Sequence, residues 1–395
     1  MLTKFRVNNF RNLINIEFLP ARVNVIIGPN NAGKTNLSSA LRFASLSASL
    51  PLDEAAGTVL GENWNLTNAY LAEKLMTFEV GMSLPEAGAI WHYTYQLELS
   101  AEREPVGGKQ ALRVVREKLE ASADSREPVT LLENLNGAAK VRDEKAPAGD
   151  APVFLEARVP ANATALSKLF DSETNRHALR FKGQLANLWY FNVAPQALRS
   201  PKVFGKGNLI NSDGTNLNKL LFSLHNENPR LERRVIEALK LVEPKIDLFR
   251  FHNPDPEFIL FMFEDAAGRP FSPQSMSDGT LRYLLLATLF ILLDEWARVG
   301  RPAPLIIFEE PENGLYVGAL KPLLARLDFG AAAGQFLFTS HNPYFIDLFD
   351  AHPECVHVMK PGVPSPVLAR PDPARLRELL GEMPLGDLHF RGLLA

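Results

Sequence analysis

Short runs of consecutive apolar residues, each followed by polar or small residues, form the clearest pattern in this sequence. Four such runs are Val23–Ile27, Asn187–Val193, Leu305–Phe308 and Gln335–Phe338. A strand of a parallel sheet is covered on both faces and is therefore apolar at nearly every position. Apolar residues at helical spacing follow the first run, from Leu37 to Ala44. The pattern predicts an α/β fold in which buried parallel strands alternate with helices.

Alternating apolar and polar positions predict a second kind of strand. The alternating segments are residues 2–9, 14–19, Thr77–Leu84, Ile90–Leu99, Leu112–Leu119 and Val129–Leu132. Because the last four lie together and small or charged loop residues separate them, residues 75–160 are expected to form an inserted β-rich lobe. No apolar heptad pattern persists for three repeats, so no coiled-coil arm is expected.

The rest of the pattern predicts mostly helices. Helical spacing covers residues 161–180, 216–226, 229–242, 317–327 and Arg375–Leu380, and Leu385–Leu394 is expected to be a closing segment. Ile246–His252 and Phe258–Glu264 are expected to pair as a hairpin. A strongly apolar helix ending near Val299 would be roughly 30 Å long, enough to cross a domain. The first helix is expected to end near Leu46–Ser49, with a break at Pro51.

A glycine-rich loop joins the first buried strand to its helix. Gly28–Thr35 fits the spacing G-x-x-x-x-G-K-[ST] between a predicted strand and a predicted helix. In such a loop backbone N–H groups point at phosphate oxygens, and the helix N-terminus adds partial positive charge. Lys34 is expected to reach the β- and γ-phosphates of ATP, and the Thr35 hydroxyl to sit on Mg²⁺. The residues of this segment expected to contact nucleotide are Gly28, Asn30, Asn31, Ala32, Gly33, Lys34, Thr35 and Asn36.

Polar residues also follow other buried strands, at the edge where an open α/β sheet binds its ligand. Glu309 and Glu310 come directly after Leu305–Phe308. The first is expected to hold the Mg²⁺ shell, and the second to orient and deprotonate the attacking water. His341 follows the last buried strand and is expected to sense the γ-phosphate.

Two further polar residues, Gln196 and Arg11, each allow two interpretations. Gln196 follows Asn187–Val193 and is either a contact of Mg²⁺ or the attacking water, or a loop amide. Arg11 lies between the first two strands and is either a surface charge or a group that points back at the nucleotide.

Ser277-Asp278-Gly279-Thr280 opens the long apolar helix. Its hydroxyl and N–H groups suit a second anion site, although a plain capping motif would have the same residues. A chain with one glycine-rich phosphate loop has little use for a second γ-phosphate site within one copy. If two copies face each other, each helix start can cap the ATP that the other copy binds.

Composition and charge set limits on the partners. The 395 residues carry a formal net charge of −3, which gives no overall attraction to nucleic acid or anionic membrane. Cys355 is the only cysteine, so no internal disulfide can form. The N-terminus lacks the apolar core of a signal peptide, and Tyr283–Leu293 is too short to cross a bilayer. We therefore expect a soluble cytoplasmic protein without a membrane partner.

The motifs occur in the order of an ABC-type ATPase head. They are Gly-x-x-x-x-Gly-Lys-Thr, Pro-Gln, Ser-Asp-Gly-Thr, Glu-Glu-Pro-Glu-Asn-Gly and Thr-Ser-His-Asn-Pro. Over nearly its whole length the chain resembles the stand-alone AAA-family ATPases of the RecF/SMC/OLD group. Ser277–Arg282 and Glu309–Leu315 carry this resemblance most specifically.

The resemblance implies a P-loop NTPase fold with a mixed sheet, an inserted antiparallel β-rich lobe and a helical signature lobe. It implies a single head over 1–395, with a P-loop lobe (1–74), the insert (75–160), the helical lobe (161–300) and a Walker B, switch-histidine and tail lobe (301–395). By this likeness Glu309 and Glu310 are the Walker B acids and Gln196 is the Q-loop residue. His341 is the switch histidine, and Ser277, Gly279 and Thr280 form the nucleotide-contacting signature.

Two positions depart from the family pattern. Tyr316-Val317 stands where the family usually has His-Pro, and Asn342 replaces a common serine. Neither should touch the bond-breaking step, but both leave open how two subunits are coupled.

The resemblance supports an ATP-gated homodimer, or a higher oligomer, whose state is read by a separate effector such as a nuclease or toxin in antiviral defence. The alternative is a RecF-like DNA-binding ATPase of repair or chromosome maintenance. Basic residues that could form a DNA track, or only solvated faces, are Arg176, Arg180, Lys182, Arg199, Lys202 and Lys206, and in a second group Arg230, Arg233 and Arg234. A self-contained nuclease is not expected, since only about 35 residues follow Lys360.

Overall fold

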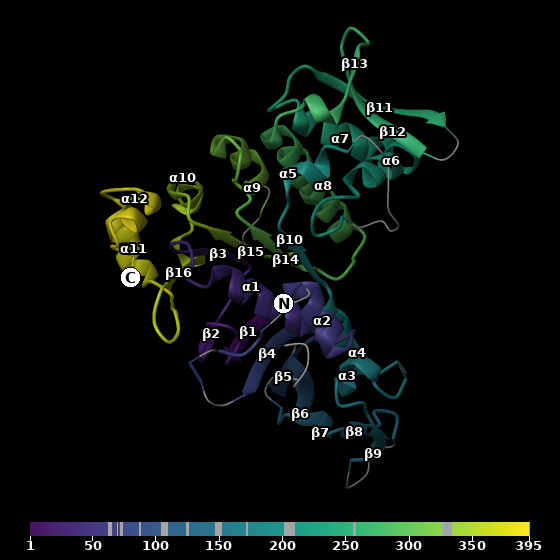
Figure 1. The fold of residues 1–395 in the computed structure, drawn as a ribbon, viewed down its shortest axis with the longest axis vertical. Helices are drawn as coiled ribbons and strands as arrows, with labels where there is room; N and C mark the ends of the chain where they lie inside the picture. The colour runs from purple at the N-terminus through teal and green to yellow at the C-terminus, as the bar shows by residue number, and fades with distance from the viewer. Residues whose placement is uncertain are drawn as a thin grey trace. The chain divides into compact units, whose positions relative to one another are not determined.

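The computed structural model describes most of the chain, in two compact units (Figure 1). The described residues are 1–61, 65–68, 70–71, 74–86, 88–103, 110–123, 126–146, 152–170, 173–200, 210–255, 258–325, 327 and 334–394. The first unit comprises residues 1–188, 354–375 and 394–395, and the second comprises residues 189–353 and 376–393. No helix in the described ranges has the length and apolarity needed to cross a membrane.

The first unit contains an eight-stranded sheet in the order β2-β1-β4-β5-β6-β7-β8-β9 (Figure 1). Its strands are β1 (Leu2–Asn8), β2 (Ile16–Phe18), β4 (Leu75–Glu86), β5 (Ala89–Arg103), β6 (Gln110–Ala123), β7 (Val129–Leu135), β8 (Ala138–Arg142) and β9 (Phe154–Arg158). Neighbouring strands pair antiparallel, and Phe5 of β1 lies opposite Val80 of β4. The strands of the predicted insert therefore extend the sheet that the N-terminus begins.

The P-loop strand belongs to a different group of strands in this unit. β3 (Val23–Ile27) is buried at every position and runs parallel to β16 (Val356–Lys360). β16 pairs antiparallel with β17 (Val367–Ala369). Two helices follow β3, α1 (Lys34–Ser47) and α2 (Leu52–Leu60). Phe43 of α1 packs on Phe10 and Phe78 with ring centroids 6.0 and 5.5 Å apart, so α1 is anchored on the large sheet.

A buried carboxylate holds the far end of α1 indirectly. Glu117 of β6 accepts N–H bonds from Ala165 (2.6 Å) and Leu166 (2.9 Å), at the start of α3 (Ala165–Lys168). Its side chain also accepts from the Tyr95 hydroxyl and the Asn134 amide. The residue before α3, Thr164, donates its hydroxyl to the Ser47 carbonyl at the end of α1, at 2.7 Å. Glu117 thus caps a short helix whose first turn is fastened to the P-loop helix.

The second unit is built around three strands in the order β10-β14-β15. Their bounds are Leu188–Phe191, Leu305–Glu309 and Gln335–Ser340. β14 and β15 are parallel, with Glu309 opposite Thr339. Phe308 and Phe338 stack with centroids 5.6 Å apart, and Phe290 of α8 stacks on Phe336 at 5.8 Å, so α8 covers these strands.

The other elements include α8 (Asp278–Arg298), α6 (Leu217–Glu227), α7 (Pro229–Leu239), the hairpin β11 (Ile246–Asp255) and β12 (Phe258–Asp265), and β13 (Pro270–Phe271). The remaining helices of the chain are α4 (Arg176–Ala186), α5 (Pro195–Leu198), α9 (Lys321–Leu324), α10 (Pro343–Ile346), α11 (Pro373–Leu380) and α12 (Leu385–Phe390). Single 3₁₀ turns occupy Pro273–Ser275, Val317–Leu320, Asp347–Phe349 and Pro353–Cys355. The predicted hairpin and the long apolar helix are both present.

Several predicted elements were wrong. Residues 161–180 form α3 and the start of α4 rather than one helix, because Leu169 turns extended and Asn175 begins the second helix. Residues 317–327 form a 3₁₀ turn and the four-residue α9, since Pro322 has no N–H and fits only a first turn. By contrast, the break predicted at Pro51 is confirmed, since α1 ends at Ser47 and Pro51 is the non-helical residue before α2.

Substitution of Glu117 should destabilise the first unit. In Glu117→Leu the two N–H groups, the Tyr95 hydroxyl and the Asn134 amide lose a buried acceptor. We expect the free energy of unfolding to fall by about 3–5 kcal/mol in denaturant titrations. The control, Glu133→Leu on an exposed position of β7, should change it by less than about 1 kcal/mol. Equal midpoints for the two variants would contradict the capping role.

Candidate functional site

The loop between β3 and α1 is shaped by two glycines. A Cβ on Gly28 would lie 2.2 Å from the Met359 carbonyl oxygen, so only glycine fits against β16. Gly33 has φ +104°, in the left-handed region that favours glycine, and Asn31 has φ +63°. The loop therefore curls tightly before α1 begins.

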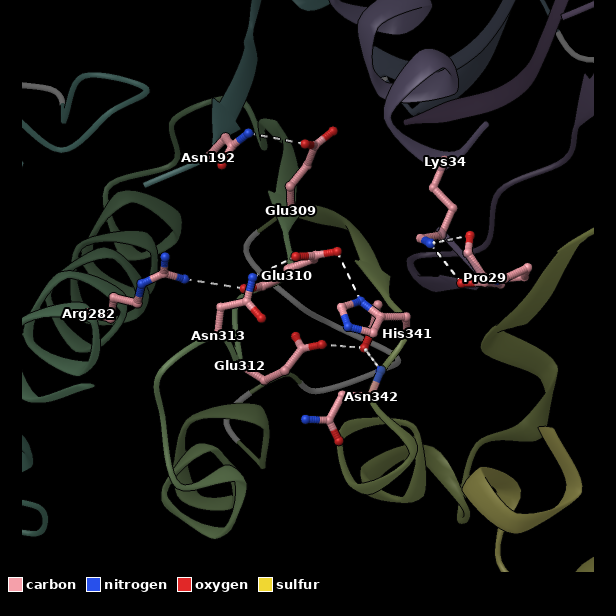
Figure 2. A network of polar contacts seen from close by, with 12 residues as sticks. Pro29, Lys34, Asn192, Arg282, Glu309, Glu310, Glu312, Asn313, His341 and Asn342 are labelled. Atoms are coloured by element: carbon pink, nitrogen blue, oxygen red, sulfur yellow. Dashed lines mark hydrogen bonds and ion pairs between the residues drawn. The ribbon is translucent and has the colours of Figure 1, made fainter. Parts of the chain in front are cut away.

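Lys34 points its ammonium group into this loop. Its Nζ donates to the carbonyls of Gly28 (2.7 Å) and Pro29 (3.0 Å), and the residue is only 7% exposed (Figure 2). Gly33, the residue before α1, offers no side-chain cap, and the first turn of α1 carries no acidic side chain. A buried cation beside uncapped helix N–H groups fits a phosphate group by charge and by hydrogen bonding.

The other residues predicted in this segment differ in exposure. Asn30, Asn31 and Thr35 are exposed, and Ala32 is buried. Asn36 donates from its amide to the Asn12 side-chain oxygen at 2.6 Å. Asn12 was not predicted, although it lies next to Arg11 in the same turn. Arg11 itself is exposed, with φ +53°, and its backbone N–H donates to the Leu66 carbonyl.

In the second unit, the end of β14 carries the two consecutive acids. Glu309 is the last residue of the strand, and its carboxylate accepts from the Asn192 amide at 3.2 Å. Glu310 has φ +45°, so the chain reverses directly after the strand. Its backbone N–H donates to the Thr339 carbonyl at 3.0 Å, which fastens the turn to β15.

The Glu310 carboxylate is held from two sides (Figure 2). The Asn313 amide donates to its Oε2 at 2.5 Å, and His341 Nδ1 lies 3.0 Å from its Oε1. His341 is exposed and follows the last residue of β15. Glu310 and His341, predicted as base and phosphate sensor, are therefore in direct contact, and Asn313 fixes the second carboxylate oxygen.

A third acid, Glu312, lies beneath this turn. It is 2% exposed, and its Oε1 accepts from the Ser340 hydroxyl. Burial raises the pKa of this carboxyl to about 7, and the Ser340 hydrogen bond opposes the rise. Glu310 and His341 also act on it, with opposite signs. No role was predicted for Glu312, whose only sequence signal is its position inside the Glu-Glu-Pro-Glu stretch.

The predicted signature segment forms the N-terminus of α8. Ser277 is the N-cap, and its hydroxyl accepts from the Thr280 N–H at 3.0 Å. A Cβ on Gly279 would lie 2.5 Å from the Gly314 carbonyl oxygen, so the signature turn packs directly on the segment that follows β14. Ser277 is exposed, whereas Gly279 and Thr280 are buried.

Two arginines secure the signature segment. Arg199 contacts the Asp278 carboxylate and donates to the Gln274 and Met276 carbonyls at 2.9 and 2.8 Å. Arg282 donates to the Glu310 carbonyl at 3.4 Å, and burial lowers the pKa of its guanidinium. Gln196 is exposed on the same short helix, α5, that precedes Arg199.

The predicted site residues thus form two groups. The first unit carries Arg11 and the loop residues Gly28–Asn36, and the second carries Gln196, Ser277, Gly279, Thr280, Glu309, Glu310 and His341. Within the described residues no group of three or more His, Cys, Asp or Glu side chains makes a metal site of its own. Mg²⁺ at phosphate sites is usually held by one or two carboxylates plus phosphate oxygens, and Thr35 in the first unit and Glu309 in the second each carry an oxygen ligand of the kind that this ion binds.

Comparison with known proteins identifies the fold. A family model described as "AAA domain, putative AbiEii toxin, Type IV TA system" matches residues 23–347, a range that contains every motif of the site. The chain is similar to an SMC head bound to the C-winged helix domain of ScpA, with 12% identity and a TM-score of 0.53, covering 95% of this chain and 99% of that one. The predicted ABC-type P-loop head is therefore confirmed. No curated protein sequence matches the chain.

Two further SMC heads are similar. One, from Thermotoga maritima, has 13% identity and a TM-score of 0.43 over 94% of this chain and 99% of that one. The other, derived from Pyrococcus furiosus with an extended coiled coil and bound to the C-terminal domain of ScpA, has 11% identity and a TM-score of 0.49 over 97% and 99%.

The buried Glu312 carboxyl should make stability depend on pH. Its pKa is about 7 when folded against an ordinary 4.5, so the folded state binds the proton more tightly. The free energy of unfolding should then fall by about 3 kcal/mol as pH rises from below 4.5 to above 7. In Glu312→Gln that contribution is absent, so denaturant titrations of both proteins at pH 5 and pH 8 should give different pH dependences. Parallel dependences would show that Glu312 ionises freely in the folded protein.

Proposed function

Because the chain belongs to this AAA domain family of ABC-type ATPases, we propose that it binds and hydrolyses ATP with Mg²⁺ and that ATP joins two copies head to tail. The observation that carries the proposal is the Glu310 carboxylate, held by Asn313 and His341 at the end of a buried strand. Glu310 is a non-glycine residue with a positive φ, and strained backbone of this kind clusters at functional sites.

Binding is assigned to the first unit. Backbone N–H groups of the loop, such as those of Asn31 and Gly33, and the Lys34 ammonium would hold the β- and γ-phosphates. Lys34 would exchange its bonds to the Gly28 and Pro29 carbonyls for phosphate oxygens. Thr35, Glu309 and Gln196 would hold Mg²⁺, which supplies charge neutralisation on the phosphate oxygens when bound.

Hydrolysis is assigned to Glu310 and His341. Glu310 accepts a proton from the water that attacks the γ-phosphate, and Asn313 keeps the carboxylate in place for this transfer. His341 contacts one Glu310 oxygen, and it would sense the γ-phosphate of the bound nucleotide. A base already held in one rotamer loses less freedom when the reactants align.

The proposal of a dimer is supported by the signature segment. Ser277 is exposed at the N-terminus of α8, a 21-residue helix, and carries hydroxyl and N–H groups suited to a γ-phosphate. We place that phosphate on the partner copy, as in an ATP sandwich. Tyr316, which departs from the family pattern and is 83% exposed, would lie near the contact between the copies.

A separate effector, a toxin or nuclease, would read whether the dimer is closed. The family description names a toxin and a Type IV toxin–antitoxin system, which supports a defence setting for this chain. The DNA-binding alternative has weaker support, because Arg176 and Arg180 pair with Glu86 and Arg199 pairs with Asp278. Arg234 pairs with Asp294, and Lys202 and Lys206 lie outside the described residues.

Lys34→Ala should abolish nucleotide binding. Loss of the buried ammonium removes a charge-assisted contact to two phosphates, so ATP affinity should fall roughly a hundredfold or more. Isothermal calorimetry measures the affinity, with Lys140→Ala at an exposed position of β8 as the control. Undiminished affinity in Lys34→Ala would refute the phosphate site.

Glu310→Gln should separate binding from turnover. The amide cannot accept the proton, so steady-state hydrolysis should fall by roughly 10²–10⁴ while ATP still binds. Size-exclusion chromatography with ATP should then show a stable dimer. Rapid turnover by this variant would mean that another group is the base.

Ser277→Arg should leave ATP binding to the monomer intact and stop hydrolysis. The large cation would block contact between the α8 N-terminus and a partner's nucleotide. Ser277→Ala is the milder comparison, since it removes the N-cap bond and the contact with the Thr280 hydroxyl without adding a charge, and loss of such a cap costs about 1 kcal/mol. Turnover at the wild-type rate in Ser277→Arg would remove the argument for a shared site.

A further inference from the structure

Glu312 is a buried acid that the proposed mechanism does not use. It lies three residues beyond β14, yet its side chain returns to Ser340, the last residue of β15. Glu312 is 2% exposed and Ser340 is fully buried. Their contact therefore ties together the two strand ends that carry Glu310 and His341.

The direction of this hydrogen bond matters. A serine hydroxyl has one proton to donate and lone pairs that accept. Ser340 donates its proton to Glu312 Oε1, and its oxygen accepts the Asn342 N–H at 3.0 Å. Because the carboxyl takes the only hydroxyl proton, the lone pairs stay aimed at Asn342. The Glu312 contact thereby orients the backbone on the far side of His341.

The short turn over 340–342 sets the direction of the His341 ring. His341 lies between Ser340 and Asn342, and Asn342 is also fixed because its side chain accepts from the Tyr344 N–H at 3.0 Å. With both neighbours held, His341 Nδ1 lies 3.0 Å from Glu310 Oε1. A turn that lost the Ser340 bond would let this ring leave the Glu310 carboxylate.

We propose that Glu312 is a positioning residue for hydrolysis, acting through Ser340 and the 340–342 turn to hold His341 against Glu310. The inference rests on the proposed ATPase function and names a further residue that this function needs. Glu312 itself does not contact nucleotide in this scheme.

Stability alone does not account for an acid at this place. Burial disfavours the charged form strongly enough to raise the Glu312 pKa to about 7, and its Oε2 makes no hydrogen bond among the described residues. A well-packed apolar side chain at such a place is often neutral or stabilising. The acceptor for Ser340 is what an apolar side chain could not supply.

The test compares a variant that removes the hydrogen-bond acceptor for Ser340 with a variant that keeps it. Glu312→Leu removes the acceptor, whereas Glu312→Gln keeps an oxygen for the Ser340 hydroxyl. We expect kcat to fall at least about tenfold in Glu312→Leu and in Ser340→Ala, with ATP affinity unchanged within about twofold, and to stay near wild type in Glu312→Gln. The double variant Glu312→Leu/Ser340→Ala should be no slower than either single variant, because both act through one contact.

Glu232→Leu is the matched control. Glu232 is also largely buried in the second unit and bonds a histidine, His225, at 2.8 Å, but on α7. Its loss should leave kcat unchanged. Wild-type kcat in Glu312→Leu, additive losses in the double variant, or a loss of ATP affinity equal to the loss of kcat would each overturn the positioning role.

A second readout does not depend on turnover. In protein labelled with ¹⁵N-histidine, the His341 ring resonance, assigned with His341→Gln, should shift in Glu312→Leu and Ser340→Ala but not in Glu312→Gln. An unchanged resonance overturns the inference. If the wild-type protein bound no ATP and showed no turnover, the proposed function would fail, and this resonance would still decide whether Glu312 positions His341.

Discussion

The parallel pairing of β14 with β15 is the constraint on which the second unit depends. It sets Glu309 opposite Thr339, so the residues that follow the two strands leave the sheet side by side. The bond from the Glu310 N–H to the Thr339 carbonyl continues the pairing one step past the strand end. A shift of one residue would turn every side chain to the other face, and Glu310 and His341 would no longer meet. The apolar stack of Phe308, Phe338 and Phe336 beneath them holds this register.

In the first unit, packing contacts fix the position of the backbone loop between β3 and α1. The loop begins where Gly28 approaches the Met359 carbonyl closely, and α1 beyond it is held by Phe43 on Phe78. At its end, Thr164 bonds the Ser47 carbonyl, and Glu117 caps the helix that Thr164 begins. The antiparallel strands of residues 75–158 therefore act as a rigid backing for the P-loop helix.

The elements near the motifs could be predicted from sequence because their signals are local. Val23–Ile27 and Leu305–Glu309 are continuous apolar runs, and Gly28 and Gly33 mark the loop between strand and helix. What could not be predicted depends on contacts between distant segments. β1 pairs with β4 across about seventy residues, and β16 lies beside β3, pairings that no local pattern specifies. Residues 161–180 failed as one helix because the Thr164 side chain caps α3 at its start, and Leu169 turns extended directly after four helical residues.

The residues of the candidate site also divide into those that a local motif predicts and those that only the fold brings into view. Lys34, Glu309, Glu310 and His341 belong to spaced motifs and were predicted from them, whereas Asn192 and Glu312 act through partners far along the chain. An acid within a motif gives no sequence sign that it is buried, since burial depends on Ser340 coming from another strand. Polar residues that brace a site are therefore visible only once the fold brings their partners together.

The central claim is that each chain carries two incomplete half-sites, and mixing two inactive variants tests it most directly. Lys34→Ala lacks a working phosphate loop but keeps its signature segment, and Ser277→Arg has the opposite defect. In a mixed dimer one intact loop meets one intact signature segment. Equal amounts should therefore recover roughly a quarter of wild-type ATP turnover, because random pairing makes half of the dimers mixed, each with one complete site. If mixed dimers form by native mass spectrometry and the mixture is no more active than the separate variants, the shared site does not exist.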